Sequence, residues 1–78
     1  MLYYEQKINY LILASYWIEE TLIIKQTKIT NDLEKTYKLL EKIMRTKYIV
    51  SATLLQLRYN VNGVLITREI YSVTRLKD

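Results

Sequence analysis

Apolar and polar side chains alternate over the first 24 residues of the chain. Nearly every even position from Tyr4 onward is apolar, whereas the odd positions mix polar and apolar residues. A period of two is typical of a β-strand, whose successive side chains point to opposite faces. The polar tripeptide Glu19–Thr21 interrupts the run, and a three-residue loop there would keep the flanking apolar residues on one face. We therefore predict two antiparallel strands, over residues 6–18 and 22–29.

The middle of the chain has the spacing of an amphipathic helix. Apolar residues recur three or four positions apart, which places them on one helix face: Leu33, Tyr37, Leu40 and Met44. Asn31 precedes this stripe and Glu34 follows three residues later, a spacing similar to that of a capping box. We predict a helix over residues 32–46 with Asn31 as its N-cap.

The last third of the chain reads as a second hairpin. Asn62-Gly63 lies between β-rich runs, and this dipeptide favours a two-residue type I′ turn. Such a turn pairs Val61 with Val64 and predicts strands over residues 48–60 and 64–75. The pairs that follow from it are Tyr59 with Ile66, Leu57 with Arg68, Gln56 with Glu69, Leu55 with Ile70, Leu54 with Tyr71 and Ala52 with Val73.

The order of elements predicts the α+β class. The expected fold is ββαββ, a four-stranded antiparallel sheet of two hairpins with one helix packed on one face. A chain of 78 residues holds one such domain, so we assign residues 1–78 to a single domain.

Both faces of this predicted sheet carry apolar side chains, and one helix covers only one of them. We interpret the surplus as a protein interface formed by Leu11, Leu13, Trp17, Leu54, Tyr71 and Val73. A homodimer is the commonest form of such an interface, and a protein or nucleoprotein partner is the other. The structural alternative is a curled sheet whose single core takes up both sets of residues.

Charge is distributed unevenly along a chain of net charge +4. The first 24 residues carry one Lys and three Glu, so the basic excess lies in the remainder. A basic strip interleaved with Tyr is typical of DNA- or RNA-binding surfaces, whereas the simpler interpretation is a solvated helix face. The candidate nucleic-acid-binding residues are Lys35, Lys38, Lys42, Arg45, Arg58, Arg68 and Arg75.

The composition excludes several kinds of site. The chain has no Cys and no His, which removes thiolate metal sites and the usual triad base, and its single Gly leaves no glycine-rich phosphate loop. We therefore expect no cofactor, no metal, no small-molecule ligand and no catalytic residue. One enzymatic alternative remains, a metal-free ribonuclease that would use Arg58, Arg68, Tyr71 and Arg75.

The apolar run from Ile8 to Ile18 is eleven residues long, about half of what a spanning helix needs, and we expect an intracellular, soluble protein. A small Ile-, Lys- and Tyr-rich chain without motifs resembles accessory proteins of viruses and mobile elements, including small inhibitors of host defence complexes. This resemblance implies a binding or regulatory protein that inhibits a protein or nucleoprotein complex in the cytoplasm of a host cell.

Overall fold

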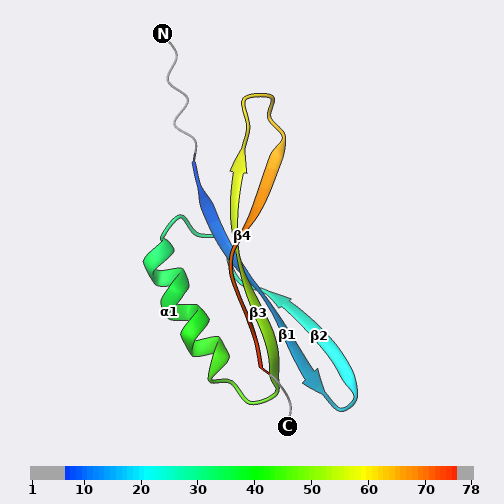
Figure 1. Ribbon diagram of the computed structural model, residues 1–78. Coiled ribbons are helices and arrows are strands. Elements are labelled where there is room, and N and C mark those ends of the chain that lie inside the picture. Colours follow the sequence, from blue (N-terminus) through cyan, green and yellow to red (C-terminus); the bar gives the residue numbers. More distant parts are fainter. Residues whose placement is uncertain (1–6, 76–78) are drawn as a thin grey trace.

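The fold is a ββαββ arrangement with one antiparallel sheet, as the sequence predicts (Figure 1). The computed structural model describes residues 7–75. Strand order in the sheet is β2-β1-β3-β4, so β1 and β3 are central and β2 and β4 are edges. The elements are β1 (Asn9–Ile18), β2 (Thr21–Gln26), α1 (Leu33–Met44), β3 (Ile49–Tyr59) and β4 (Leu65–Thr74). The predicted beginning of the first strand at residue 6 lies outside the described residues.

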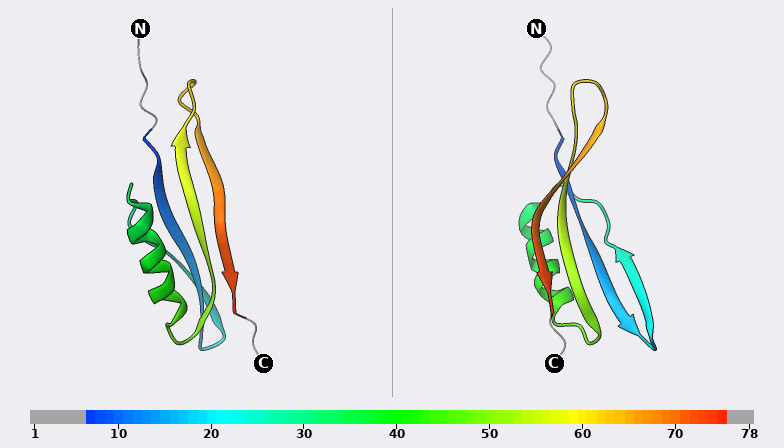
Figure 2. Two further views of the ribbon diagram at one scale, coloured as in Figure 1. Left: turned by 60° about the vertical axis from the view of Figure 1, so that its left-hand side comes forward. Right: turned by 45° about the vertical axis from the view of Figure 1, so that its right-hand side comes forward.

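The helix α1 packs on one side of the sheet, against β1 and β3. Because β2 and β3 both pair antiparallel with β1, they run parallel to each other, and α1 connects them across β1. The views in Figures 1 and 2 agree that α1 lies on one side only and that the end of the β3–β4 hairpin extends beyond it. We call the side that carries α1 the helix side and the opposite side the outer face.

The N-cap of α1 lies one residue later than predicted, and the helix ends at Met44, two residues before its predicted end. Asp32, and not Asn31, is the N-cap: its Oδ1 accepts a hydrogen bond from the Lys35 backbone N–H at 3.0 Å. The Thr30 hydroxyl accepts from the Asp32 N–H at 3.2 Å, which fixes the chain as it enters the helix. A carboxylate at this end also lies favourably in the helix dipole.

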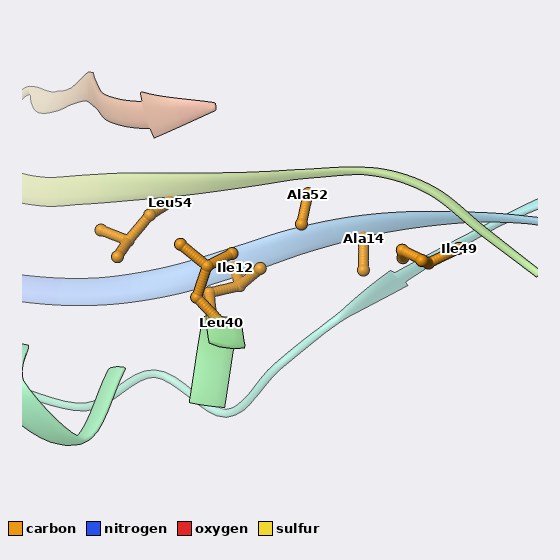
Figure 3. Close-up of a cluster of buried hydrophobic side chains, with 6 residues drawn as sticks. All are labelled: Ile12, Ala14, Leu40, Ile49, Ala52 and Leu54. Atoms are coloured by element: carbon orange, nitrogen blue, oxygen red, sulfur yellow. The ribbon is translucent and has the colours of Figure 1, made fainter. Parts of the chain in front are cut away.

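The core lies between α1 and the two central strands. Ile12 and Leu54 are fully buried cross-strand partners, and Leu40 extends from α1 toward them (Figure 3). The next pair, Ala14 and Ala52, has short side chains that allow the helix to approach the sheet closely. Ile49, the first residue of β3, completes this cluster, which is the one hydrophobic core among the described residues.

The β1–β2 turn differs from the prediction. Ile18 pairs with Thr21, so the loop is the dipeptide Glu19-Glu20 and not a tripeptide. Both residues have positive φ, +47° and +65°, as a type I′ turn requires. The loop is one residue shorter than expected, so β2 is shifted by one position and Leu22 and Ile24 lie on the outer face, opposite Trp17 and Ser15.

The β3–β4 hairpin closes with a three-residue loop and not with the predicted two-residue turn. Asn60 donates its N–H to the Val64 carbonyl at 2.9 Å, and Gly63 adopts φ +77°. Tyr59 therefore pairs with Leu65, and the predicted pairs nearest the loop are wrong, namely Val61–Val64, Tyr59–Ile66, Leu57–Arg68, Gln56–Glu69 and Leu55–Ile70.

A β-bulge then restores the expected register further along the same hairpin. Leu55 pairs with Glu69 and Leu54 pairs with Tyr71, so Ile70 is the extra residue on β4. The predicted pairs Leu54–Tyr71 and Ala52–Val73 are confirmed. A second irregularity, at Val50, adjusts the pairing of β3 with β1.

The single helix of the described segment has 12 residues, and no helix there is long and apolar enough to cross a membrane.

Candidate functional site

The outer face is an apolar surface of the sheet that α1 leaves uncovered. Pairing in the three ladders assigns each strand residue to a face, because cross-strand partners share one. The residues of this face are Asn9, Leu11, Leu13, Ser15, Trp17, Leu22, Ile24, Gln26, Ser51, Thr53, Leu55, Leu57, Tyr59, Leu65, Thr67, Glu69, Ser72 and Thr74.

The apolar members of the outer face form a diagonal stripe. The stripe starts at Leu22, Ile24 and Trp17 on the β1–β2 hairpin, crosses the central strands, and ends at the far end of the β3–β4 hairpin. We call it the outer stripe; its remaining members are Leu11, Leu13, Leu55, Leu57, Tyr59 and Leu65.

Burial along the outer stripe is high in the middle and low at both ends. Leu11 is only 6% exposed, whereas Trp17 is 43%, Ile24 65% and Tyr59 60% exposed. Outside the stripe the face carries hydroxyl side chains, and Thr53 and Ser72 are hydrogen bonded to each other at 3.1 Å. The outer stripe is therefore a continuous apolar surface with weakly polar flanks.

Lys and Arg are missing from the outer face among the strand residues that the structure describes; Glu69, on the edge strand β4, is its one charged member. The strand cations all lie on the helix side, where Lys25 pairs with Ala14, Arg58 with Ile66 and Arg68 with Gln56. The two faces therefore differ sharply in charge, although the chain as a whole is basic.

The predicted interface residues divide between the two faces. Leu11, Leu13 and Trp17 lie on the outer face, whereas Leu54, Tyr71 and Val73 lie on the helix side. Leu54 is fully buried in the core, so it contributes to folding and offers no contact surface. The sequence reasoning assigned these two sets to one face because it predicted no pairing between the first and third strands, and in the structure Leu54 pairs with Ile12 and not with Leu11 or Leu13.

The same reasoning missed part of the outer stripe. Leu22, Ile24 and Leu55 were placed on the opposite side, and Leu57 and Leu65 were not singled out at all. Tyr59, which the sequence analysis named only as a strand partner of Ile66, also belongs to the stripe. A search under each possible turn length would have found Leu22 and Ile24, because a one-residue change inverts a whole strand. The face of Leu55 and Leu57 depends on the pairing of β3 with β1, which no turn fixes.

The predicted basic residues all lie on the helix side: on α1 and at its C-cap, within β3 and β4, or directly after β4. Three lysines of α1 are exposed, and Lys38 makes one weak ion pair with Glu34 at 3.8 Å. Arg75 is engaged in the fold, since its guanidinium donates to the Met44 carbonyl at the end of α1 at 2.6 Å. The remaining exposed members of this basic surface are Lys35, Lys42, Arg45, Arg58 and Arg68.

The helix side has one transverse row that combines an aromatic ring, an amide and a guanidinium. Tyr10, Gln56 and Arg68 are successive cross-strand partners on β1, β3 and β4, and Arg58 follows two positions further along β3. Tyr10 also bridges to Thr30, which holds the segment before α1 beside this row.

The structure does not bring together the residues of the ribonuclease hypothesis. Arg58 and Ser51 are seven residues apart on β3, and Arg75 follows the β4 partner of Ser51. At ~3.3 Å per residue, Arg58 and Arg75 are therefore about 23 Å apart, too far to act on one phosphate. Over residues 7–75 no group of three or more His, Cys, Asp or Glu side chains could hold a metal ion. Comparison with known proteins found no match to a family model, to a curated protein or to a solved structure.

Proposed function

We propose that this protein is a non-enzymatic binding protein and that the outer stripe is its contact surface. The observation that carries the proposal is the exposure of large apolar side chains on a face that α1 does not cover. A small monomeric domain rarely leaves a contiguous apolar surface of this extent in water.

The experiment compares the wild-type chain with two charge variants in an affinity capture. Ile24→Lys places a charge on the exposed end of the outer stripe, and the matched control Ile23→Lys adds the same charge one residue away, on the helix side. We expect Ile24→Lys to lose the captured species and Ile23→Lys to retain it, with circular dichroism confirming that both variants are folded. Equal capture by both variants would exclude the outer stripe as the contact surface.

A second candidate function is binding of single-stranded nucleic acid on the helix side. The row formed by Tyr10, Gln56 and Arg68 supports it through its two polar members, because guanidinium and amide groups contact phosphates and base edges, while the Tyr10 ring packs partly against the core. The exposed lysines of α1 add positive charge on the same side of the sheet.

The test of this second candidate is the affinity for a labelled oligonucleotide at 50 and 200 mM salt. Phosphate contacts release counterions, so binding should weaken by orders of magnitude, and Arg68→Ala should lower the slope of log affinity against log salt by about one. Lys47→Ala is the matched control, because Lys47 lies in the loop after α1 and over the Tyr48 ring, away from this row. A flat salt response would exclude the function.

A further inference from the structure

We infer that the occupant of the outer stripe is a second copy of this chain, packed face to face about a two-fold axis. The inference rests on the proposed function, because it names the partner of the same surface. It goes beyond it by committing to one geometry, a sandwich of two sheets about 10 Å apart.

Charge is the first argument for a second copy. Two molecules of net charge +4 repel each other wherever their basic sides meet. The outer face is the side of the sheet on which no strand residue is Lys or Arg, and its one carboxylate, Glu69, lies on the edge strand β4. Two copies can therefore approach through this face with little charge to desolvate, and their basic helix sides then point away from each other.

Area is the second argument. β1, β3 and β4 have 10, 11 and 10 residues and β2 has 6, so at ~3.3 Å per residue and ~4.8 Å between strands the face measures about 590 Å². Covering it on both copies removes about 1,180 Å² from water, which lies at the lower limit of the range for stable, specific interfaces. A smaller face would support only a transient contact.

Shape is the third argument. A two-fold interface requires a surface that is complementary to itself. The outer stripe meets this condition, because its apolar residues run diagonally across the sheet with hydroxyl residues on the flank, so a symmetric copy lays apolar residues on apolar residues. In such a dimer the side chains of Trp17 and Tyr59, which are exposed in the single chain, become buried as Leu11 already is.

The test uses sedimentation together with the fluorescence of Trp17, the single Trp of the chain. From 1 to 100 µM we expect the mass to rise to twice 9.4 kDa, with Trp17 emission moving to shorter wavelength and becoming less accessible to a quencher. A monomer at 100 µM with an accessible Trp17 overturns the inference and leaves the proposed function standing, since the capture experiment measures any partner.

Variants on the central strand β3 separate face-to-face packing from pairing of sheet edges. Thr53→Lys adds a charge in the middle of the outer face, and Gln56→Lys adds it to the helix side of the same strand. We expect the dimer dissociation constant to rise at least tenfold for Thr53→Lys and to stay unchanged for Gln56→Lys. Leu65→Lys, at the exposed end of the stripe, serves if Thr53→Lys does not fold. A dimer unaffected by the outer-face variants would show edge pairing and overturn the inference.

Discussion

The β1–β2 turn should become more stable when glycine replaces its second residue. Glu19 and Glu20 have φ of +47° and +65°, in the left-handed region that side chains with a Cβ disfavour. Neither residue makes a side-chain hydrogen bond or ion pair within the described part of the chain, and both are exposed. The substitution Glu20→Gly therefore removes backbone strain without removing a contact.

The expected gain follows from two opposing terms. A left-handed conformation costs a residue with a Cβ about 1–2 kcal/mol, and glycine avoids this cost. Glycine also raises the entropy of the unfolded chain, which costs about 0.5–1 kcal/mol. The net stabilisation is about 0.5–1 kcal/mol, or roughly 2–8 °C in Tm for a domain of this size.

Thermal and urea unfolding, followed by circular dichroism at one fixed protein concentration, would measure this gain. Glu20→Ala is the matched control, because it removes the same negative charge but retains a Cβ, and it should leave Tm nearly unchanged. If Glu20→Ala stabilised the protein as much as Glu20→Gly, charge repulsion between the two carboxylates and not φ would be the cause. A lower Tm for Glu20→Gly would refute the reasoning altogether.

Two further predictions concern the helix and the core. Asp32→Ala should cost about 1 kcal/mol in the free energy of unfolding, because it removes the N-cap hydrogen bond to Lys35, whereas Asn31→Ala should cost almost nothing; equal losses in urea melts would argue against Asp32 as the cap. Leu54→Ala should cost about 2–5 kcal/mol, since Leu54 is fully buried, whereas Leu39→Ala on the exposed side of α1 should change stability by less than about 1 kcal/mol; comparable losses from both would contradict the position of the core.

The elements with local signals could be predicted from the sequence. The helix followed from the spacing of its apolar residues, and both hairpins followed from alternating runs. The N-cap was missed by one residue because Asn31 and Asp32 are both good capping residues, and local preference alone does not choose between them. The Thr30 hydroxyl favours Asp32 as the cap, because it accepts a hydrogen bond from the Asp32 N–H. Thr30 is itself positioned by its β-bridge to Tyr10, a contact distant in sequence.

The turns could not be predicted with the same certainty, because their chemistry is unusual or degenerate. Glu19-Glu20 lacks the Asn and Gly that normally mark a type I′ turn, so the sequence gives no sign that it adopts one. Asn62-Gly63 does mark a turn, but Gly at a positive φ suits a three-residue loop with a glycine bulge equally well. Here the Asn60 side chain favours the longer loop, because its Oδ1 accepts from both the Asn62 and the Val64 N–H groups.

The existence of a surplus apolar face and the identity of its residues have different physical origins. The surplus depends on how many apolar side chains the strands contain and how few one twelve-residue helix can cover, so no choice of register removes it. Which residues form this face depends on whether odd or even positions of each strand point outward. One loop residue inverts this assignment for all of β2, and the extra residue Ile70 inverts it part-way along β4. If the first turn were one residue longer, every residue of β2 would change face. Leu22 and Ile24 would then lie on the helix side, and Lys25 would lie on the outer face. The short, strained turn thus keeps positive charge off the surface through which, we propose, two copies meet.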